Sequence, residues 1–386
     1  MKLLHVVSSY LPARRYGGTI VSVHGLCRAL AARGHDVHVY TTSVDGAGDS
    51  PVRHGEPVDI EGVKVWYFQS NNLRRLYYAP ALAGALRQSV NEFAVVHTHA
   101  IYLWPLWAAA REAGRAGVPY VVSPRGMLEK DLIERKSAIW KAALIGFVEK
   151  RSLEGAAAIH VTSSREADEA AAFGFSLRRV SEIPNGVDAD RAVFTASPAV
   201  SRVIEQGPYV LFLGRINWKK GIDRLIESMP HAPGIRLIAA GHDDEGYTSE
   251  LESLATRLGL RERVIFAGPV HGDDKAALVA RARALVLPSY SENFGNVVLE
   301  AMAAARPVVV SAEVGVADLV QRNGCGVVID GGAEQLGRAI ARVAADSGAG
   351  DEMGRRGKAV AARYSWDSVA AQMEALYQSL QRPSRC

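Results

Sequence analysis

The stretch GRINWKKG, residues 214–221, contains three cations, and two of them, Arg215 and Lys220, are positioned where phosphate chemistry could use them. The stretch follows an apolar run, Tyr209–Leu213, that predicts a buried strand, and it precedes a helix that starts near Ile222. Arginine offers a planar fork of donors and lysine a compact charge, and the N-terminus of a helix favours anions. We therefore expect Arg215 and Lys220 to bind a diphosphate. The alternative is an ordinary solvated basic loop.

Two carboxylates lie eight positions apart in the stretch PSYSENFGNVVLEAM, residues 288–302. On a continuous helix they would lie about 80° apart, so they do not form one tight carboxylate pair. We expect Glu292, in a loop, to face a reacting sugar, and Glu300, inside a helix, to accept hydrogen bonds from a ribose. The amides of residues 294–296 would hold phosphate or sugar oxygens. The preference of helix N-termini for acids would explain Glu292 alone.

The first half of the chain offers two weaker motifs. Gly17 and Gly18 lie between the predicted strand Leu3–Ser8 and a helix, where backbone amides could approach a phosphate or sugar closely. A tight loop would need the same glycines. His97 and His99 share one face of a predicted strand and could bind a metal, but no third ligand is evident, so we expect no metal site.

Other nucleotide and metal motifs are missing or poorly placed. The sequence has no GxGxxG after its first strand and no GxxxxGK[ST] loop, which disfavours a dehydrogenase or a kinase. Asp188-Ala189-Asp190 matches the DxD pattern of metal-dependent sugar transferases, but it overlaps a predicted linker. We interpret the match as coincidence and expect no metal requirement.

Helices and strands must position these residues, and the hydrophobic pattern predicts one set of such elements in each half of the chain. In each half, short apolar runs alternate with helical periodicity, which predicts two doubly wound α/β domains that face a cleft. We expect an N-terminal acceptor-binding domain over 1–190 and a C-terminal nucleotide-sugar-binding domain over 191–364. A linker covers 185–206, and a last helix over 365–386 packs back towards the first domain. The predicted strands are Leu3–Ser8, Asp36–Thr41, Val63–Phe68, Ala94–His97, Tyr120–Ser123 and Ala158–Val161, then Tyr209–Leu213, Arg236–Ala240, Val264–Ala267, Ala284–Leu287, Val308–Ser311 and Val327–Ile329.

Composition excludes several classes of protein. The 386 residues include 45 Lys+Arg and 41 Asp+Glu, and a net charge of +4 is too small for a dedicated nucleic-acid binder. The cysteines, Cys27, Cys325 and Cys386, are isolated, so we expect no disulfide framework and a reducing compartment. No apolar run approaches the ~18–20 residues of a membrane span, and the N-terminus does not resemble a signal peptide. We expect a cytoplasmic protein.

The charge is unevenly distributed along the chain. Residues 1–150 hold 18 Lys+Arg and 12 Asp+Glu, a net +6, and the remainder carries −2. Two basic-aromatic stretches lie in or near this first part, at 135–151 and at Leu73–Tyr78. We expect the first domain to sit against an anionic membrane surface, peripherally on the cytoplasmic face of the inner membrane. The alternative is a solvated basic face.

Taken together, the motifs resemble those of glycosyltransferase family 4, retaining nucleotide-sugar enzymes with the GT-B fold. Further matches are Ile183-Pro184-Asn185-Gly186-Val187-Asp188, Phe266-Ala267-Gly268-Pro269-Val270 and Ser123-Pro124-Arg125-Gly126-Met127-Leu128, and the resemblance runs from about residue 1 to 380. The last motif is similar to a branch that assembles exopolysaccharides, lipopolysaccharides and other cell-surface glycans. One departure is Ala305, where the family usually has glycine.

The resemblance implies roles for individual residues. Glu300 would bind the ribose and the Val270 backbone the base, while Arg215 and Lys220 would neutralise the departing diphosphate. Glu292 and His99 would be the catalytic residues. The donor sugar and its phosphate would be held by these two together with Gly17, Gly18, Asn293, Phe294, Gly295 and Asn296, with Arg125 as a further substrate-binding residue. The donor would be a UDP- or GDP-linked sugar, used as a substrate, and no cofactor is implied.

Three functions are compatible with this pattern. The first is retaining transfer of a sugar to a glycan or lipid-linked acceptor. The second is a nucleotide-sugar epimerase on the same fold, which would convert its donor without an acceptor. The third is a non-catalytic nucleotide-sugar-binding protein, against which the presence of Arg215, Lys220, Glu292 and Glu300 argues.

Overall fold

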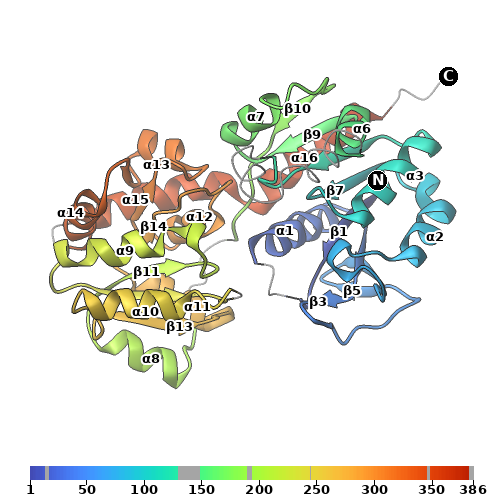
Figure 1. Cartoon of the computed structure of the whole chain (residues 1–386). Helices are drawn as coiled ribbons and strands as arrows, with labels where there is room; N and C mark the ends of the chain where they lie inside the picture. The colour runs from blue at the N-terminus through green and yellow to red at the C-terminus, as the bar shows by residue number, and fades with distance from the viewer. Residues whose placement is uncertain (14–16, 129–147, 189–193, 244, 346–347, 382–386) are drawn as a thin grey trace. The chain divides into compact units, whose positions relative to one another are not determined.

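The computed structural model divides the chain into two compact units (Figure 1). Unit 1 comprises Met1–Gly186 and Trp366–Cys386, and unit 2 comprises Val187–Ser365. The structure describes all residues except 14–16, 129–147, 189–193, 244, 346–347 and 382–386. Each unit is an α/β layer structure built around its own sheet, as the alternating sequence pattern predicts.

Unit 1 contains an eight-stranded sheet in the order β10-β9-β8-β7-β1-β2-β6-β5. Its pairings are parallel except for the edge strand β5, which is antiparallel to β6. The strands are β1 (Lys2–Ser9), β2 (Asp36–Thr42), β5 (Val58–Ile60), β6 (Val63–Phe68), β7 (Val95–His99), β8 (Tyr120–Ser123), β9 (Ala158–Val161) and β10 (Val180–Glu182), with a small separate hairpin of β3 (Val44–Asp45) and β4 (Gly48–Asp49).

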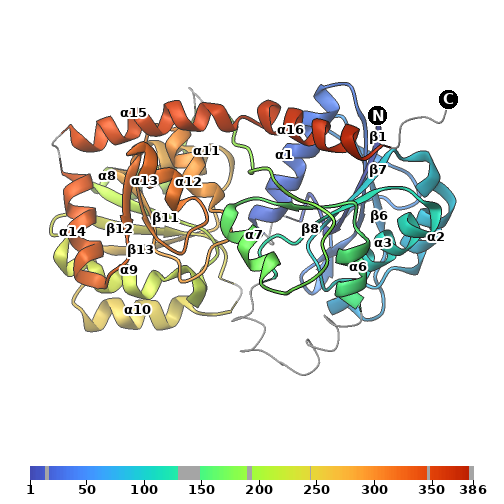
Figure 2. The same cartoon turned by 90° about the horizontal axis from the view of Figure 1, so that it is seen from above.

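Helices cover both faces of this sheet and enclose two apolar cores (Figure 2). Successive residues of one strand point to opposite faces, so Leu3 lies in one core and Leu4 in the other. The helices are α1 (Gly18–Ala32), α2 (Pro80–Ser89), α3 (Trp104–Ala116), α6 (Lys150–Gly155), α7 (Ser164–Ala171) and α16 (Trp366–Leu380), with 3₁₀ turns η2 (Arg74–Leu76) and η3 (Val90–Glu92).

The last helix, α16, belongs to unit 1 although the whole of unit 2 precedes it in the chain. It packs against α1, and its apolar face is buried in the core on that side of the sheet. Trp366 fits only because two of its neighbours have no side chain. A Cβ on Gly25 or Gly186 would lie 2.3 Å or 2.5 Å from the indole ring.

Unit 2 contains a six-stranded parallel sheet in the order β13-β12-β11-β14-β15-β16, packed in one continuous apolar core. Its strands are β11 (Tyr209–Leu213), β12 (Arg236–Ala240), β13 (Val264–Gly268), β14 (Ala284–Leu287), β15 (Val308–Ser311) and β16 (Gly326–Ile329). Its helices are α8 (Pro198–Glu205), α9 (Ile222–Ser228), α10 (Thr248–Arg257), α11 (Gly272–Arg281), α12 (Asn296–Ala303), α13 (Ala317–Asn323), α14 (Ala333–Ala344) and α15 (Ala349–Ala361), with 3₁₀ turns η5 (Trp218–Lys220), η6 (Met229–His231) and η7 (Ala362–Tyr364).

The structure departs from the predicted elements in short or irregular segments. The predicted linker contains the helix α8, whose N-cap Ser197 accepts a hydrogen bond from the amide of Val200. The edge strands β5 and β10 and the β3–β4 hairpin were not predicted.

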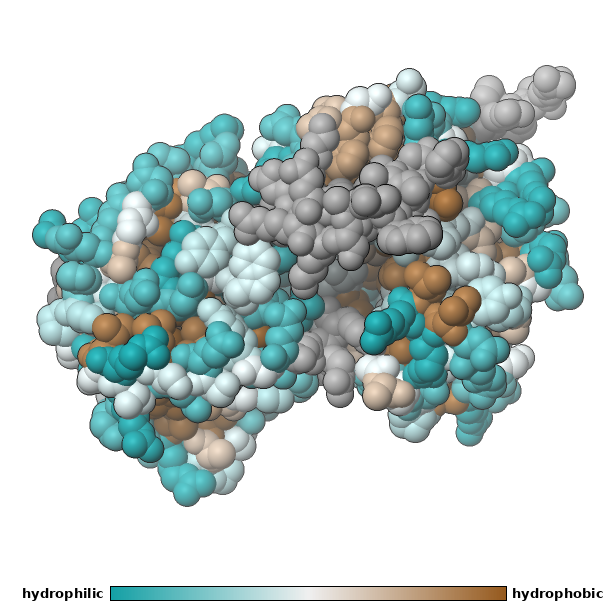
Figure 3. Space-filling model, viewed as in Figure 1, coloured by the Kyte–Doolittle hydropathy of each residue, from teal (hydrophilic) through white to brown (hydrophobic). Residues whose placement is uncertain are grey.

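No helix among the described residues is both long and apolar enough to span a bilayer. The face seen in Figure 3 mixes hydrophilic residues with small apolar areas.

Candidate functional site

Two loops of unit 2, after β11 and after β14, meet at the carboxyl ends of neighbouring strands. Gly221 makes the approach possible, because its φ of 63° is left-handed and a Cβ there would lie 2.0 Å from the carbonyl oxygen of Pro288. The amide of Tyr290 donates to the carbonyl of Lys219 at 2.7 Å. The predicted phosphate loop and the predicted sugar loop are therefore joined through their backbones.

The junction brings two predicted site residues into contact. The ammonium of Lys220 forms an ion pair with the carboxylate of Glu292, and each side chain is only 18% exposed. The backbone of Glu292 is fixed independently, since its amide donates to Glu313 and its carbonyl accepts from Gly315 at 2.9 Å. Sequence reasoning gave these two side chains separate roles and did not predict that they touch.

The start of α12 presents backbone amides beside this pair. Gly295 is the N-cap with φ 94°, and it offers no side chain to bond the first-turn amides. Phe294 is buried and anchors the loop in the core, while Asn296 begins the helix. The carbonyl of Asn293 packs so closely on Gly315 that a Cβ there would lie 1.9 Å away. This helix start is suited to hold an anionic or hydroxyl-rich ligand.

The remaining predicted residues of unit 2 lie on neighbouring elements. Glu300 lies inside α12, and its carboxylate is 2.7 Å from the ammonium of Lys275 on α11. Val270 follows β13 and packs partly buried against the core. Arg215 is exposed in the loop after β11. Sequence reasoning missed Lys275, because its partner depends on which helices are neighbours.

In unit 1, His99 ends β7 and is fully buried. Its Nε2 lies 2.9 Å from Nδ1 of His5, and its Nδ1 lies 3.1 Å from Nη2 of Arg125. Burial and the nearby charges hold the pKa of His99 well below its usual range, so the ring is neutral. Its predicted contact with a donor sugar stays a prediction, since both ring nitrogens already have partners within unit 1.

A second chain of polar contacts runs beside His99. The hydroxyl of Tyr377, on α16, lies 2.6 Å from Nδ1 of His97, whose Nε2 lies 2.7 Å from the hydroxyl of Ser123. Ser123 lies 2.6 Å from Nδ1 of His160, whose Nε2 bonds the carbonyl of Ile183 at 2.8 Å. Burial lowers the pKa of His160 to about 3.

The structure adds a third candidate metal ligand, His5, to the two histidines named from the sequence. His5, His97 and His99 are buried, and one ring nitrogen from each lies within 4.8 Å of the others. The parallel register pairs His5 with His97 across β1 and β7, a signal that needs the strand order. However, both ring nitrogens of His97 and of His99 already have hydrogen-bond partners, which favours a hydrogen-bonded network over a metal site.

The loop after β7 is held in an unusual conformation. Ala100 and Tyr102 have left-handed φ angles of 83° and 68°. The carboxylate of Glu149 accepts hydrogen bonds from the amide of Tyr102 at 2.5 Å and from the indole nitrogen of Trp107 at 2.6 Å. Burial raises the pKa of Glu149. Non-glycine residues with such φ angles cluster at functional sites.

The glycine motif of unit 1 opens α1. Gly17 is the N-cap with φ 72°, and a Cβ there would meet no atom within 4 Å. Gly18 is the first residue of the helix. The open space beside Gly17 is compatible with a ligand and with a simple turn.

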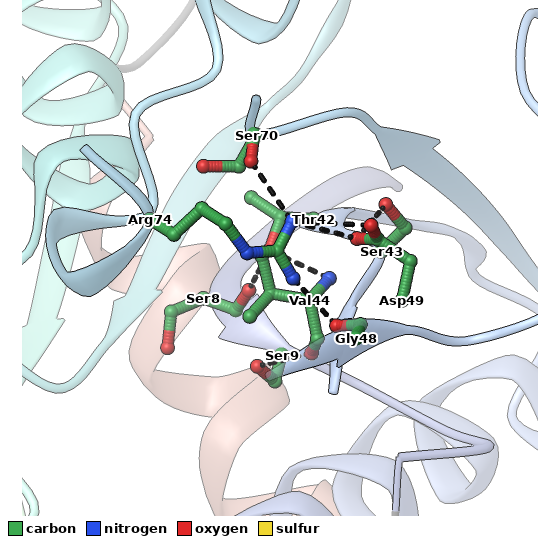
Figure 4. Close-up of polar contacts among 9 residues, drawn as sticks. All are labelled: Ser8, Ser9, Thr42, Ser43, Val44, Gly48, Asp49, Ser70 and Arg74. Carbon is green, nitrogen blue, oxygen red and sulfur yellow. Dashed lines mark hydrogen bonds and ion pairs between the residues drawn. The ribbon is translucent and has the colours of Figure 1, made fainter. Parts of the chain in front are cut away.

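The two basic-aromatic stretches have different outcomes. Residues 129–147, most of the first stretch, lie outside the described part of the chain. In the second, Leu73 and Leu76 are exposed, but Arg74 turns back onto the β3–β4 hairpin (Figure 4). Its guanidinium donates to Asp49 at 3.1 Å and to the carbonyls of Ser70 and Gly48. Arg74 is therefore a structural residue, and the cation that this stretch would offer a membrane is Arg75.

Comparison with known proteins agrees with both units. Residues 193–360 match the model for "Glycosyl transferases group 1", and residues 17–186 match the "Glycosyl transferase 4-like domain". A D-inositol 3-phosphate glycosyltransferase of Xylanimonas cellulosilytica is 30% identical, with 96% of this chain and 94% of the relative covered.

Solved structures share the complete fold. Sucrose-phosphate synthase of Thermosynechococcus elongatus superposes with a TM-score of 0.78 at 24% identity, covering 98% of this chain and 99% of that one. The Anabaena protein HepE, solved with UDP-glucose, has a TM-score of 0.77 at 22% identity, covering 98% and 100%. The expected fold, two Rossmann-like domains of the GT-B class, is confirmed.

Proposed function

Because the chain belongs to the group 1 glycosyltransferases, we propose that it moves a hexose from a UDP- or GDP-linked donor to a saccharide or lipid-linked acceptor, with retention of configuration. In this proposal, residues 191–364 bind the donor and residues 1–190 bind the acceptor. The solved complex of HepE with UDP-glucose supports a UDP-linked donor. The Ser-Pro-Arg-Gly-Met-Leu motif supports a place in the assembly of cell-surface polysaccharides.

The observation that carries the proposal is the ion pair between Lys220 and Glu292 beside the start of α12. Cleavage of a sugar–phosphate bond leaves positive charge on the sugar and negative charge on the diphosphate. In the proposed mechanism Lys220 neutralises the diphosphate, with Arg215 as a second cation, and the Gly295–Asn296 amides add hydrogen bonds. One fixed donor of this kind is worth about 10²–10³ in rate.

Glu292 has two functions in this mechanism. In the free protein it neutralises Lys220, which keeps the half-buried ammonium paired. When the diphosphate takes over Lys220, the carboxylate becomes available to the donor sugar, where it orients hydroxyls and faces the developing positive charge. Glu300 accepts hydrogen bonds from the ribose, and Lys275 holds its carboxylate in place.

Membrane association remains part of the proposal. The +6 charge of residues 1–150 and the exposed Leu73 and Leu76 support a peripheral position on an anionic bilayer, on the cytoplasmic side. Sedimentation with anionic vesicles at low salt, with neutral vesicles as control, tests this point. Absence from the anionic pellet contradicts it.

Incubation with a panel of UDP- and GDP-sugars, with and without EDTA, tests the activity. We expect release of the nucleoside diphosphate from one donor, undiminished by EDTA, and loss of about 10²–10³ in rate for Lys220→Ala. Lys219→Ala is the matched control, because it removes the neighbouring lysine, whose ammonium lies over the Trp218 ring. Conversion of a donor into its epimer without an acceptor would identify an epimerase instead. Full activity of Lys220→Ala would overturn the site.

A further inference from the structure

Arg125 of unit 1 is a cation held by neutral groups. Its guanidinium contacts Oδ1 of Asn185 at 2.8 Å and Nδ1 of His99 at 3.1 Å. Its Nε is buried and has no hydrogen-bond partner in the described part of the chain. Burial lowers the pKa of Arg125 below its usual range, and the nearby acidic groups only partly oppose that shift. The guanidinium stays protonated, and nearby negative charge balances its positive charge only in part. We call such a cation undercompensated.

The hydrogen bonds of His99 require its imidazole ring to be neutral. Arginine can only donate, so Nδ1 of His99 accepts from Arg125, and the ring proton must be on Nε2. That proton is donated to Nδ1 of His5, which leaves the proton of His5 on its Nε2, a buried atom with no described partner. A second proton on His99 would have to go on Nδ1, so His99 cannot take it without losing its bond to Arg125. Arg125 thus fixes the tautomer of His99, and His5 accepts its Nε2 proton.

The nearby carboxylate does not neutralise Arg125 directly. Glu166 is close enough to raise the pKa of Arg125, yet its two carboxylate oxygens bond other groups. Its Oε1 accepts from the amide of Gly126 at 2.8 Å, and its Oε2 accepts from the amide and hydroxyl of Thr162 at 2.7 Å and 2.9 Å. Glu166 therefore fixes the backbone that follows Arg125 and leaves the guanidinium to other ligands.

The backbone of Arg125 is also held in a costly conformation. Its φ of 57° is left-handed, which a residue with a Cβ adopts at a cost of roughly 1–2 kcal/mol. The bond from Gly126 to Glu166 and the turn from the amide of Met127 to the carbonyl of Pro124 maintain it. The residue is nevertheless only partly buried, so a ligand can reach it. Strain maintained at a partly exposed, undercompensated cation is typical of a binding site.

We propose that Arg125 binds a phosphoryl group of the acceptor. A planar guanidinium binds phosphate oxygens in pairs, and a phosphate with two charges gains more from an undercompensated cation than a carboxylate does. The net +6 of residues 1–150 favours the same ligand. The inference rests on the proposed glycosyl transfer and names the chemistry of its acceptor, a sugar or lipid that carries a phosphate.

Binding of inorganic phosphate tests this site without the reaction. The test uses a chain with Arg215→Ala and Lys220→Ala, so that the donor site of unit 2 does not contribute. We expect phosphate to raise the melting temperature by several degrees over chloride of equal ionic strength, and acetate to have little effect. Adding Arg125→Gln should abolish the phosphate effect, and Arg125→Lys should retain a smaller one. An equal phosphate shift in all three chains would overturn the proposal.

A second measurement covers the case in which Arg125→Gln does not fold. Phosphate titration of the ¹⁵N-arginine chain should shift one Nε–H signal, which Arg125→Lys removes and thereby assigns. No shifting Arg125 signal would also overturn the proposal. Donor turnover is measured separately on the unaltered chain. Turnover without phosphate binding refutes only this inference, whereas phosphate binding without turnover of any donor refutes the proposed function.

Discussion

The two units share one architecture but place their polar side chains in opposite ways. Among the described residues, unit 1 buries twenty-one polar or charged side chains, and unit 2 buries three serines. In unit 1 many of these polar groups lie on the strands themselves, as His5, His97 and His160 do. In unit 2 the strands are almost entirely apolar, and reactive groups such as Lys220 and Glu292 lie on the loops after them.

This difference indicates which contacts a ligand would have to rearrange in each unit. Unit 2 has a rigid apolar scaffold, and a new ligand there only has to rearrange loop contacts such as the Lys220–Glu292 pair. Unit 1 has already satisfied most of its polar groups internally, and Arg125 is the cation that its network leaves undercompensated. In our proposal, specificity for the acceptor depends on the core of unit 1 as well as on its surface.

Of the changes considered, lowering the pH should produce the largest difference in stability between the two units. His5 and His160 have pKa values lowered to about 3, and those of His97 and His99 are also well below 6.5. An unfolded histidine takes up a proton near pH 6.5, so between pH 6.5 and about 3 the unfolded state binds more protons. Each buried histidine then removes about 1.4 kcal/mol of stability per pH unit as the pH falls, and full stability is present above pH 6.5.

Peptide-resolved hydrogen exchange between pH 7 and 4.5 measures this effect. Unit 1 should lose protection first, because unit 2 holds no histidine among its described buried side chains. Loss of protection in both units at the same pH would contradict the comparison.

Removing one reactive group from each unit should have different consequences. Glu292→Gln should lower transfer by about 10²–10³ with little change in melting temperature, because its loop is fixed by backbone bonds. His99→Gln should lower both, because it leaves His5 and Arg125 without their partner inside the core. Kinetics and thermal unfolding of both variants decide this, and an unchanged melting temperature for His99→Gln would contradict it.

A matched pair of glycines compares the helix entries of the two units. Gly17 and Gly221 are N-caps of α1 and α9 and both have a positive φ, but only Gly221 has the left-handed helical conformation. Gly221→Ala should cost about 3 kcal/mol, because its Cβ would lie 2.0 Å from the carbonyl of Pro288. Gly17→Ala should cost less, because a Cβ there meets no atom within 4 Å and adds only the strain of a positive φ. Urea unfolding measures both, and equal losses would show that the loop junction yields easily.

The smallest expected effect is a gain. Ala305, where the related family usually has glycine, has a left-handed φ of 55° after α12. Ala305→Gly removes that strain and should stabilise unit 2 by about 0.5–1 kcal/mol, the difference between the relief and the greater freedom of unfolded glycine. Urea unfolding at pH 7.5 checks it, with Gly117→Ala as the opposite change at a left-handed helix end in unit 1.

The sequence was sufficient for elements whose local pattern is strong. Buried parallel strands such as Val308–Ser311 are continuous apolar runs, and every predicted strand is present within two residues of its expected bounds. Helix α8 was missed because Pro198 and the small residues before it are typical of a linker and also of a helix N-terminus. The edge strands β5 and β10 are half-exposed, so they lack the apolar run that marks a central strand.

The site was harder to predict, because its contacts depend on which elements are neighbours. The types and positions of Glu292, Lys220 and Arg125 could be read from motifs. That Lys220 touches Glu292 depends on the pairing of β11 with β14, and that His5 touches His99 depends on the register of β1 against β7. Local sequence carries neither piece of information.

The position of α16 has a consequence for the order of events during synthesis. Trp366 and Tyr377 complete the core of unit 1, yet they leave the ribosome after all of unit 2. Unit 2 can therefore finish folding as soon as its last strand and helices emerge, whereas unit 1, begun first, waits with an open face beside α1 until the final helix arrives. A chaperone that binds the nascent chain should accordingly hold the first-made unit longest.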